Sequence, residues 1–418
     1  MDPSRQVVIT GLGVVSPLGI GRETFWESLR ASKNGVVKIP TYADSEMPVD
    51  FGAPLQDFDP KQYVKPRKAL KVMCREIQTA FSAAALATDD AKLHDADTPP
   101  ERKGAVFGSQ MLYGDVFEYA DLFRECIEDG EFTYDKFGPS FPNRMYPLWM
   151  LKNLPNMAAC HIAIAQDAKG PNNTILLGEA SSLLAVDEAA SAIRRNAADV
   201  MIVGGTGTRL ELTGWIFRGA WNMSRRNDDP SVACRPFDRD RDGIVNGEGA
   251  GSLILESREH AVRRGAPILA SLHEAGNSFA PHGQDLSEAV QRSIQAALRS
   301  AGVEASDIGH VNAHGISTVL GDRAESQAIR ETLGDVPVTA LKSQFGHLGA
   351  GSGAVELIGT VLALQNSFVP PTLNYENPDP RCPVNVIHGQ PLTDAKPFAL
   401  KLSQSQTGQT VAMVVGAE

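Results

Sequence analysis

The sequence predicts an α/β fold made of two similar halves, because strand and helix patterns alternate along the whole chain. Short apolar runs bounded by turn residues predict buried strands, and longer segments with apolar residues three or four apart predict helices. The alternation occurs over residues 1–256 and again, with different residues, over residues 257–418. This arrangement indicates a duplicated α/β unit.

The first half begins with an apolar strand and contains a clear strand, helix, strand unit at its centre. A helix over residues 73–87 has an apolar face formed by Met73, Ile77, Phe81 and Ala84, which are spaced for a helical period. In chain order we expect a strand at 7–10 with a glycine turn at 11–13, a helix at 24–31, an irregular stretch at 40–70, a helix at 73–87, a strand at 104–108, a cap over a cleft at 110–150, then a strand at 174–177, a helix at 180–196 and strands at 199–204 and 252–256.

The second half repeats the plan without a low-complexity linker between the halves. In chain order we expect a strand at 268–274, a helix at 286–301, a strand at 310–313, a helix at 322–331, a strand at 336–340, a helix at 351–365 and strands near 385–387, 399–402 and 410–415.

Composition places the chain among ordinary globular proteins. Its 418 residues are 42% hydrophobic and 21% charged, which is enough to bury a large core. A net charge of −11 argues against general binding to nucleic acid or to a membrane surface. The five cysteines are odd in number and have no CxxC spacing, so we expect reduced thiols and no zinc site. With no apolar leader and no long apolar run, we expect a cytoplasmic protein.

Two segments resemble known ligand-binding motifs, but each lacks a residue that its motif requires. Gly11-Leu12-Gly13 follows a strand, but Ser16 stands where a dinucleotide fingerprint requires glycine. Asp238, Asp240 and Asp242 resemble the start of a calcium loop, but Gly249 stands where a bidentate glutamate is required. We therefore expect no cofactor and no metal.

Several ordered blocks carry a family resemblance that covers essentially the whole chain. The blocks are Val8–Gly19 at the N-terminus, Gly178-Glu179-Ala180 between the central strand and helix, Arg235-Pro236-Phe237-Asp238, Arg241–Gly251, Asn312-Ala313-His314-Gly315, Lys342-Ser343-Gln344-Phe345-Gly346-His347 and Pro370–Asn374. Together they resemble the elongating β-ketoacyl-acyl carrier protein synthases of the thiolase superfamily. The resemblance implies a thiolase-like fold with five layers, helix, sheet, helix, sheet, helix, and it implies a dimer.

The resemblance places Glu179 where these enzymes have their cysteine nucleophile. It assigns His314 and His347 to hydrogen bonds with the thioester oxygen, where placed donors stabilise developing negative charge. It also places Lys342 beside one histidine, with Glu356 near the lysine. A helix start favours an anion, while burial favours the neutral acid. We expect Glu179 to be ionised and hydrogen-bonded to backbone N–H groups and one histidine.

Three functions are compatible with a cysteine-less site. The first is decarboxylation of malonyl-carrier thioesters without acyl transfer to the protein, as in family members with glutamine at this position. The second is a non-catalytic partner, resembling a chain-length factor, that forms a heterodimer with a cysteine-bearing ketosynthase. The third, acyl transfer or hydrolysis at the Glu179 carboxylate, is disfavoured because it requires a well-aimed carboxylate and an anhydride intermediate.

The resemblance also predicts contacts outside the reaction centre. It places Thr318, Ser405 and Phe345 at the substrate, with Ser405 at the position of a gating phenylalanine. A basic run would dock an acidic acyl carrier protein, because clustered positive charge steers acidic partners. The run consists of Lys65, Arg67, Lys68 and Lys71.

Overall fold

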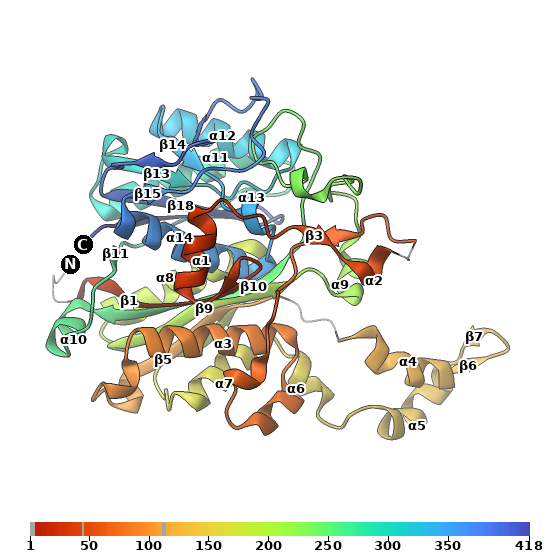
Figure 1. The fold of residues 1–418 in the computed structure, drawn as a ribbon. Coiled ribbons are helices and arrows are strands. Elements are labelled where there is room, and N and C mark those ends of the chain that lie inside the picture. Colours follow the sequence, from red (N-terminus) through yellow and green to blue (C-terminus); the bar gives the residue numbers. More distant parts are fainter. Residues whose placement is uncertain (1–4, 44–45, 111–113) are drawn as a thin grey trace.

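A computed structural model describes residues 5–43, 46–110 and 114–418 (Figure 1). The first half contributes five neighbouring strands, in the spatial order β1 (Val7–Ser16), β10 (Glu248–Ser257), β9 (Val200–Thr208), β5 (Lys103–Gly108) and β8 (Asn172–Ile175). The second half contributes β11 (Ala270–Leu272), β19 (Gln409–Gly416), β18 (Phe398–Gln404), β13 (Ile308–Asn312), β14 (Pro337–Thr339) and β16 (Asn385–Val386). Strand β11 pairs with both β1 and β19, so it joins the two halves at their edges.

Helices cover the strands in layers (Figure 1). Helices α3 (Arg75–Asp90) and α7 (Met157–Ala165) pack on the outer face of the first half. Helices α11 (Leu286–Ala301) and α12 (Val319–Leu333) cover the outer side of the second half. Between the halves lie α8 (Ser181–Arg194) and α14 (Ser352–Asn366), and twelve consecutive residues of α14, Ser352 to Ala363, are buried. The order of layers agrees with the five predicted from the sequence.

Shorter elements connect these layers. They are β2 (Gly19–Ile20), α1 (Arg22–Arg30), β3 (Val37–Lys38), α2 (Pro40–Ala43), β4 (Phe51–Gly52), α9 (Leu212–Arg218), α10 (Arg258–Arg263), β12 (Gly276–Phe279), α13 (Lys342–Phe345), β15 (Phe368–Val369) and β17 (Leu392–Thr393). Short 3₁₀ helices include Arg67–Val72 and Gly178–Ala180. Among the described residues, no helix combines the length and the hydrophobicity needed to cross a membrane.

The first strand is longer than predicted, and its glycines form no turn. Strand β1 continues through Gly11 and Gly13 to Ser16. A Cβ atom on Gly11 would lie 2.5 Å from the carbonyl oxygen of Ala87, and one on Gly13 would lie 2.0 Å from that of Ala83. The glycines therefore allow α3 to approach the strand closely, which a strand pattern alone does not reveal.

The cap predicted over a cleft at residues 110–150 is found only in part within the described residues. That part comprises α4 (Val116–Glu125), β6 (Ile127–Glu128), β7 (Glu131–Phe132), α5 (Tyr134–Arg144) and α6 (Trp149–Asn153). The segment from α4 to α5 projects away from the layered body (Figure 1). It has a small core of its own around Leu122, Cys126 and Met145. Its start, at Asp115, Phe117 and Glu118, lines a cavity of about 600 Å³ beside α3, whereas Phe123, Phe132 and Tyr134 further along are partly exposed.

The division of the chain at residues 256 and 257 stays a prediction. In the structure this point lies at the end of β10. Helix α14, from the second half of the sequence, packs against both β10 and β18. The central helix layer therefore belongs to both halves.

Candidate functional site

Glu179 lies in a single 3₁₀ turn between β8 and α8. Gly178 has a φ of +58°, a conformation that suits glycine and reverses the chain before the helix. The Ser181 hydroxyl donates to the Gly178 carbonyl and accepts from the Leu177 N–H, and the Ser403 hydroxyl donates to the Glu179 carbonyl. These bonds fix the backbone and direct the Glu179 side chain inward, where it is buried.

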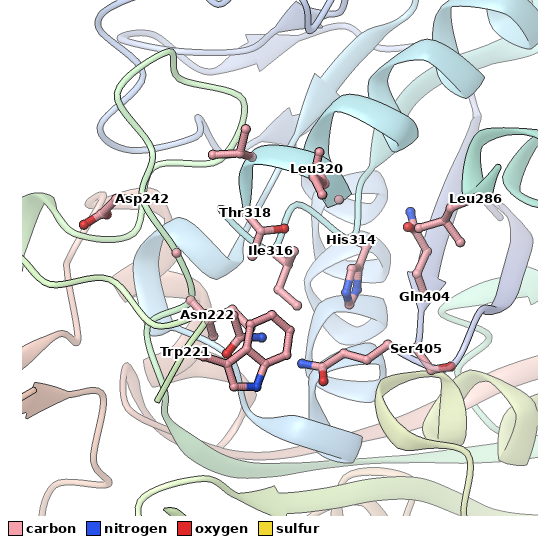
Figure 2. A pocket seen from close by; sticks show the side chains of 15 residues that line it. Trp221, Asn222, Asp242, Leu286, His314, Ile316, Thr318, Leu320, Gln404 and Ser405 are labelled. Atoms are coloured by element: carbon pink, nitrogen blue, oxygen red, sulfur yellow. The ribbon is translucent and has the colours of Figure 1, made fainter. Parts of the chain in front are cut away.

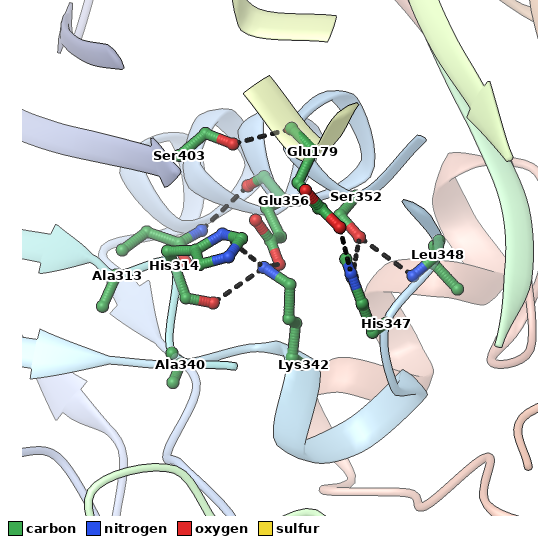
Figure 3. Close-up of polar contacts among 12 residues, drawn as sticks. Glu179, Ala313, His314, Ala340, Lys342, His347, Leu348, Ser352, Glu356 and Ser403 are labelled. Carbon is green, nitrogen blue, oxygen red and sulfur yellow. Dashed lines mark hydrogen bonds and ion pairs between the residues drawn. The ribbon is translucent and has the colours of Figure 1, made fainter. Parts of the chain in front are cut away.

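Three groups hold the Glu179 carboxylate, and Figure 3 shows one of them, His347. Arg209 Nη1 donates to Oε1 at 2.9 Å, and His347 Nε2 lies 3.2 Å from the same oxygen. The backbone N–H of Gln406 donates to Oε2 at 3.3 Å. Arg209 directly follows β9, so the end of a central strand delivers the counter-charge.

The ion pair sets the charge of Glu179. Burial alone would raise the pKa of the Glu179 carboxyl, but the hydrogen bond from His347 and the positive charge of Arg209 outweigh burial. The pKa of Glu179 therefore lies below its usual range, and the side chain is an anion at neutral pH. The predicted anion and its histidine partner agree with this geometry, whereas Arg209 was not predicted.

His347 is neutral, and both of its ring nitrogens already contact polar groups. Burial and the nearby Arg209 charge lower the pKa of His347 to about 3. Its Nδ1 lies 3.2 Å from the Ser352 hydroxyl, whose oxygen accepts from the Leu348 N–H and whose proton is thus directed to Nδ1. Nε2 lies 3.2 Å from both Glu179 Oε1 and Arg209 Nη1, so the ring contacts both members of the ion pair, and it donates to Glu179 when Nε2 carries the ring proton.

His314 is held by a separate buried network (Figure 3). The Lys342 ammonium donates to His314 Nδ1 at 3.3 Å and to the His314 carbonyl at 2.7 Å. The Glu325 carboxylate accepts from the backbone N–H groups of His314 and Gly315. Burial, followed by the charge of Lys342, keeps the pKa of His314 well below its usual range. His314 is therefore neutral, with Nε2–H as its free donor.

A second buried lysine completes this network. Glu356 pairs with Lys342 at 2.5 Å through one oxygen and with Lys401 at 2.6 Å through the other. Lys401 also donates to the carbonyl oxygens of Ala313 and Leu402. Burial lowers the pKa of Lys401 to about 8, although Glu356 opposes the shift. Lys401 therefore stabilises the segment that carries His314.

Two cavities flank the site. One, of about 410 Å³, leads to His314 between the start of α12 and the turn after β18, with Trp221, Ile316 and Thr318 on its walls (Figure 2). The other, of about 230 Å³, contains Glu179 and Arg209. Ser405 and Gln406 line both cavities and form the wall between them.

The structure brings most of the predicted site residues together. Glu179 contacts His347, whose ring centroid lies 6.2 Å from that of His314, and Lys342 lies directly behind His314. Thr318 and Ser405 line the cavity that leads to His314. Their roles in substrate binding stay predictions.

Phe345 requires a correction. It is fully buried in the main hydrophobic core, where its ring packs against Phe25 at a centroid distance of 6.1 Å. It lines neither of the two cavities, so it does not contact a substrate there. Lys342 and Phe345 are the first and last residues of α13, and Lys342 reaches His314 while Phe345 packs into the core.

The predicted docking run is exposed on the outer surface next to α3. All four of its basic side chains reach solvent. No ion pair in the part of the chain that the structure describes involves any of them: Lys65, Arg67, Lys68 or Lys71. The run is free to meet an acidic partner, and its role stays a prediction.

Sequence reasoning missed Arg209, Gln406 and Lys401. Arg209 follows the strand predicted at 199–204, which in fact extends to Thr208, so the arginine was not assigned to the strand end. Gln406 acts through its backbone N–H, which no side-chain pattern reveals. Lys401 was visible as a charged residue inside an apolar strand, a signal that indicates a buried ion pair. No group of three potential metal ligands occurs within the described ranges.

Comparison with known families agrees with this geometry. The β-ketoacyl synthase N-terminal domain matches residues 4–261, and the C-terminal domain of the same family matches residues 270–376. The chain therefore belongs to the β-ketoacyl synthase family. It is 35% identical over 397 residues to a 3-oxoacyl-[acyl-carrier-protein] synthase 2 from Synechocystis, covering 92% of both chains. It is 36% identical to the protein of that name from Coxiella burnetii, covering 92% of this chain and 91% of the relative.

Solved structures confirm the predicted thiolase-like fold. A β-ketoacyl synthase from Burkholderia phymatum superposes with a TM-score of 0.87 at 31% identity, over 99% of both chains. A type II polyketide ketosynthase, solved with its acyl-carrier protein, gives 0.86 at 30% identity, over 99% of this chain and all of the other. The ishigamide ketosynthase/chain length factor gives 0.83 at 29% identity, over 99% of both chains.

Proposed function

We propose that this chain is a ketosynthase homologue that binds acyl carrier protein, forms no acyl-enzyme and acts as the partner subunit of a cysteine-bearing synthase. One observation carries the proposal. The position of the family's nucleophile holds a carboxylate that is buried and paired with Arg209 and His347. An anion fixed by two partners is a poor nucleophile, and its presence occupies the Nε2–H of His347.

The remaining features support a role in a carrier-dependent assembly. The cavity that reaches His314 is open to solvent beside exposed Trp221 and Leu320, so a thioester arm has a path to the histidine. The basic run around Lys65 offers a surface for an acidic carrier. The names of two neighbours, a ketosynthase bound to its acyl-carrier protein and a ketosynthase/chain length factor, are consistent with both partners.

Intact mass measurement tests the absence of an acyl-enzyme. We expect no mass gain after the protein is incubated with acyl-CoA or acyl-carrier protein. The Glu179→Cys variant is expected to gain one acyl group, because Arg209 would stabilise the thiolate in the same pocket. Sedimentation with a cysteine-bearing synthase from the same source should give a one-to-one complex. An acyl adduct on any cysteine of the parent protein, or failure to form that complex, would contradict the proposal.

A second candidate function is decarboxylation of malonyl-carrier thioesters. It is favoured by the state of His314, whose Nε2–H is free at the end of an open cavity, whose ring is held by Lys342 and whose backbone N–H is held by Glu325. A thioester oxygen beside His314 would accept a hydrogen bond from Nε2–H, and this bond would stabilise the negative charge that develops on the oxygen as the enolate forms. The Glu179 anion opposes this function, because a malonyl carboxylate placed beside it meets a like charge in a poorly solvated site.

The Glu179→Gln variant separates the two candidates. If the pocket is a latent decarboxylase, the variant should release CO₂ from malonyl-carrier protein at least about tenfold faster than the parent, because it removes the like charge and releases His347 Nε2–H. His314→Ala or His347→Ala in the same background should abolish the gain. If Glu179→Gln binds the carrier but stays as inactive as the parent, the partner-subunit function is retained and decarboxylation is rejected.

A further inference from the structure

The wall between the two cavities lies where an acyl group would pass from one to the other. Ser405 and Gln406 line both cavities, and the Gln406 N–H is bonded to the Glu179 carboxylate. A thioester that entered beside Trp221 and reached His314 would direct its acyl end across this wall. The acyl end would then meet the cavity that contains Glu179.

The walls of that second cavity carry charged and polar groups and no large apolar side chain among the described residues. The polar lining includes Gln110, Glu179, Arg209, Arg218, Ser405, Gln406 and Thr407. The other described lining residues are Gly178, Gly349 and Ala350, so the carbon surface comes from backbone, from one methyl group and from the stems of the polar side chains. A hydrocarbon chain gains affinity from apolar surface that it contacts, but the carbon surface here surrounds a buried ion pair that the chain would have to cover.

Hydrogen bonds to neighbouring residues hold the polar side chains of this cavity in place. Arg209 donates through Nε to Asn246 at 3.2 Å in addition to its bond with Glu179. Gln110 donates to the Thr208 carbonyl at 2.6 Å and to Glu76 at 3.3 Å. Placing hydrocarbon here would strip water from a buried ion pair without replacing its contacts, which is unfavourable.

We propose that the Glu179–Arg209 ion pair is a specificity determinant that excludes hydrocarbon acyl chains. The site then accepts a carrier arm that is unloaded or that bears a short, polar acyl group. This inference rests on the proposed carrier-binding function, because it concerns what the bound arm carries.

Calorimetric titration with amide-linked pantetheine analogues tests the inference. The probes are the pantetheine amide itself and its acetyl and octanoyl derivatives, which cannot be hydrolysed. We expect the parent protein to bind the acetyl and octanoyl probes with affinities within about threefold of each other, since the added methylenes meet a buried ion pair and no apolar side chain larger than Ala350. In Glu179→Ala/Arg209→Ala, which removes the pair without changing net charge, the octanoyl probe should bind at least about tenfold more tightly than the acetyl probe.

A matched control distinguishes the effect of losing the ion pair from the effect of enlarging the cavity. Gln406→Ala widens the same cavity but keeps the ion pair and the backbone N–H, so it should show no preference for octanoyl. A tenfold octanoyl preference in the parent, or an equal gain in Gln406→Ala, would overturn the specificity inference while leaving carrier binding intact. Failure of every probe to bind would overturn the proposed function and this inference with it. If the double variant does not fold, the parent and Gln406→Ala still decide the question.

Discussion

Replacing Arg209 with methionine is expected to lower the free energy of unfolding by about 3–5 kcal/mol at pH 7, the range typical of a buried charge that loses its partner. The Glu179 carboxylate would keep only His347 and the Gln406 N–H, and neither carries a compensating charge. Methionine preserves much of the side-chain volume, so the effect reports the lost charge more than a cavity. Chemical denaturation monitored by fluorescence measures it.

The pH dependence identifies the cause. In the parent protein the pKa of Glu179 is lower in the folded state, so its stabilising contribution is present above the unfolded pKa and is lost as the pH falls through the folded pKa. Without Arg209, burial dominates and the folded pKa rises above the unfolded value. The deficit of Arg209→Met should therefore shrink as the pH is lowered from 7 to 5.

A double substitution serves as the control. Glu179→Gln/Arg209→Met removes both charges and should recover most of the stability that Arg209→Met loses, because two neutral groups can replace a buried pair at little cost. If the double variant is as unstable as the sum of the two single variants, the two side chains do not act as a pair and our account of the site fails.

Replacing Glu211 with glutamine is expected to raise stability at alkaline pH and to flatten its pH dependence. Glu211, at the start of α9, lies beside the buried Glu76 in the first turn of α3, close enough for the two carboxyl groups to interact. Burial, followed by the negative charge of Glu76, raises the pKa of Glu211 to about 10, and burial also raises the pKa of Glu76. At neutral pH the two carboxyl groups therefore share one proton.

The sign of the effect follows from that proton. The unfolded chain releases it near its ordinary pKa of about 4.5, whereas the folded protein keeps it up to about pH 10. Folding thus takes up a proton across this window, and stability falls as the pH rises through it. Glutamine supplies the N–H donor permanently, so Glu211→Gln should exceed the parent by more than about 1 kcal/mol at pH 9 and by little at pH 5.

Denaturant midpoints at pH 5, 7 and 9 measure this difference. Glu259→Gln is the matched control, because Glu259 is exposed at the start of α10 and no ion pair among the described residues involves it. The control should leave the pH profile of the parent unchanged. A profile for Glu211→Gln as steep as that of the parent would mean that the Glu76–Glu211 pair does not hold the proton.

The retained histidines have different states, and this difference decides what the site can do. The Nε2 atom of His347 is occupied by its contact with Glu179, whereas the Nε2–H of His314 is free and faces an open cavity. The buried Lys342–Glu356–Lys401 network fixes the ring and the backbone of His314 at the end of this cavity. We therefore expect the cavity at His314 to bind a group even when no acyl transfer takes place.

The sequence by itself determined the layered fold, most element positions and the identity of the residues that meet at the site. Helix α11 begins and ends at the predicted residues 286 and 301, because its apolar spacing is regular and Gly302 ends it. Glu179, His314, His347 and Lys342 were each identified because the motifs around them resemble the active-site blocks of a known family. Such features depend on neighbouring residues, so a linear pattern records them.

Only the tertiary structure decided how Glu179 is held and where Phe345 points. The counter-charge comes from Arg209, thirty positions along the chain, and another donor is the backbone of Gln406 in a distant hairpin. The glycines of β1 likewise permit a close helix contact instead of making the predicted turn. Ion pairs between distant segments and close approaches of backbone depend on how layers stack, and residue spacing within one segment carries no record of that stacking.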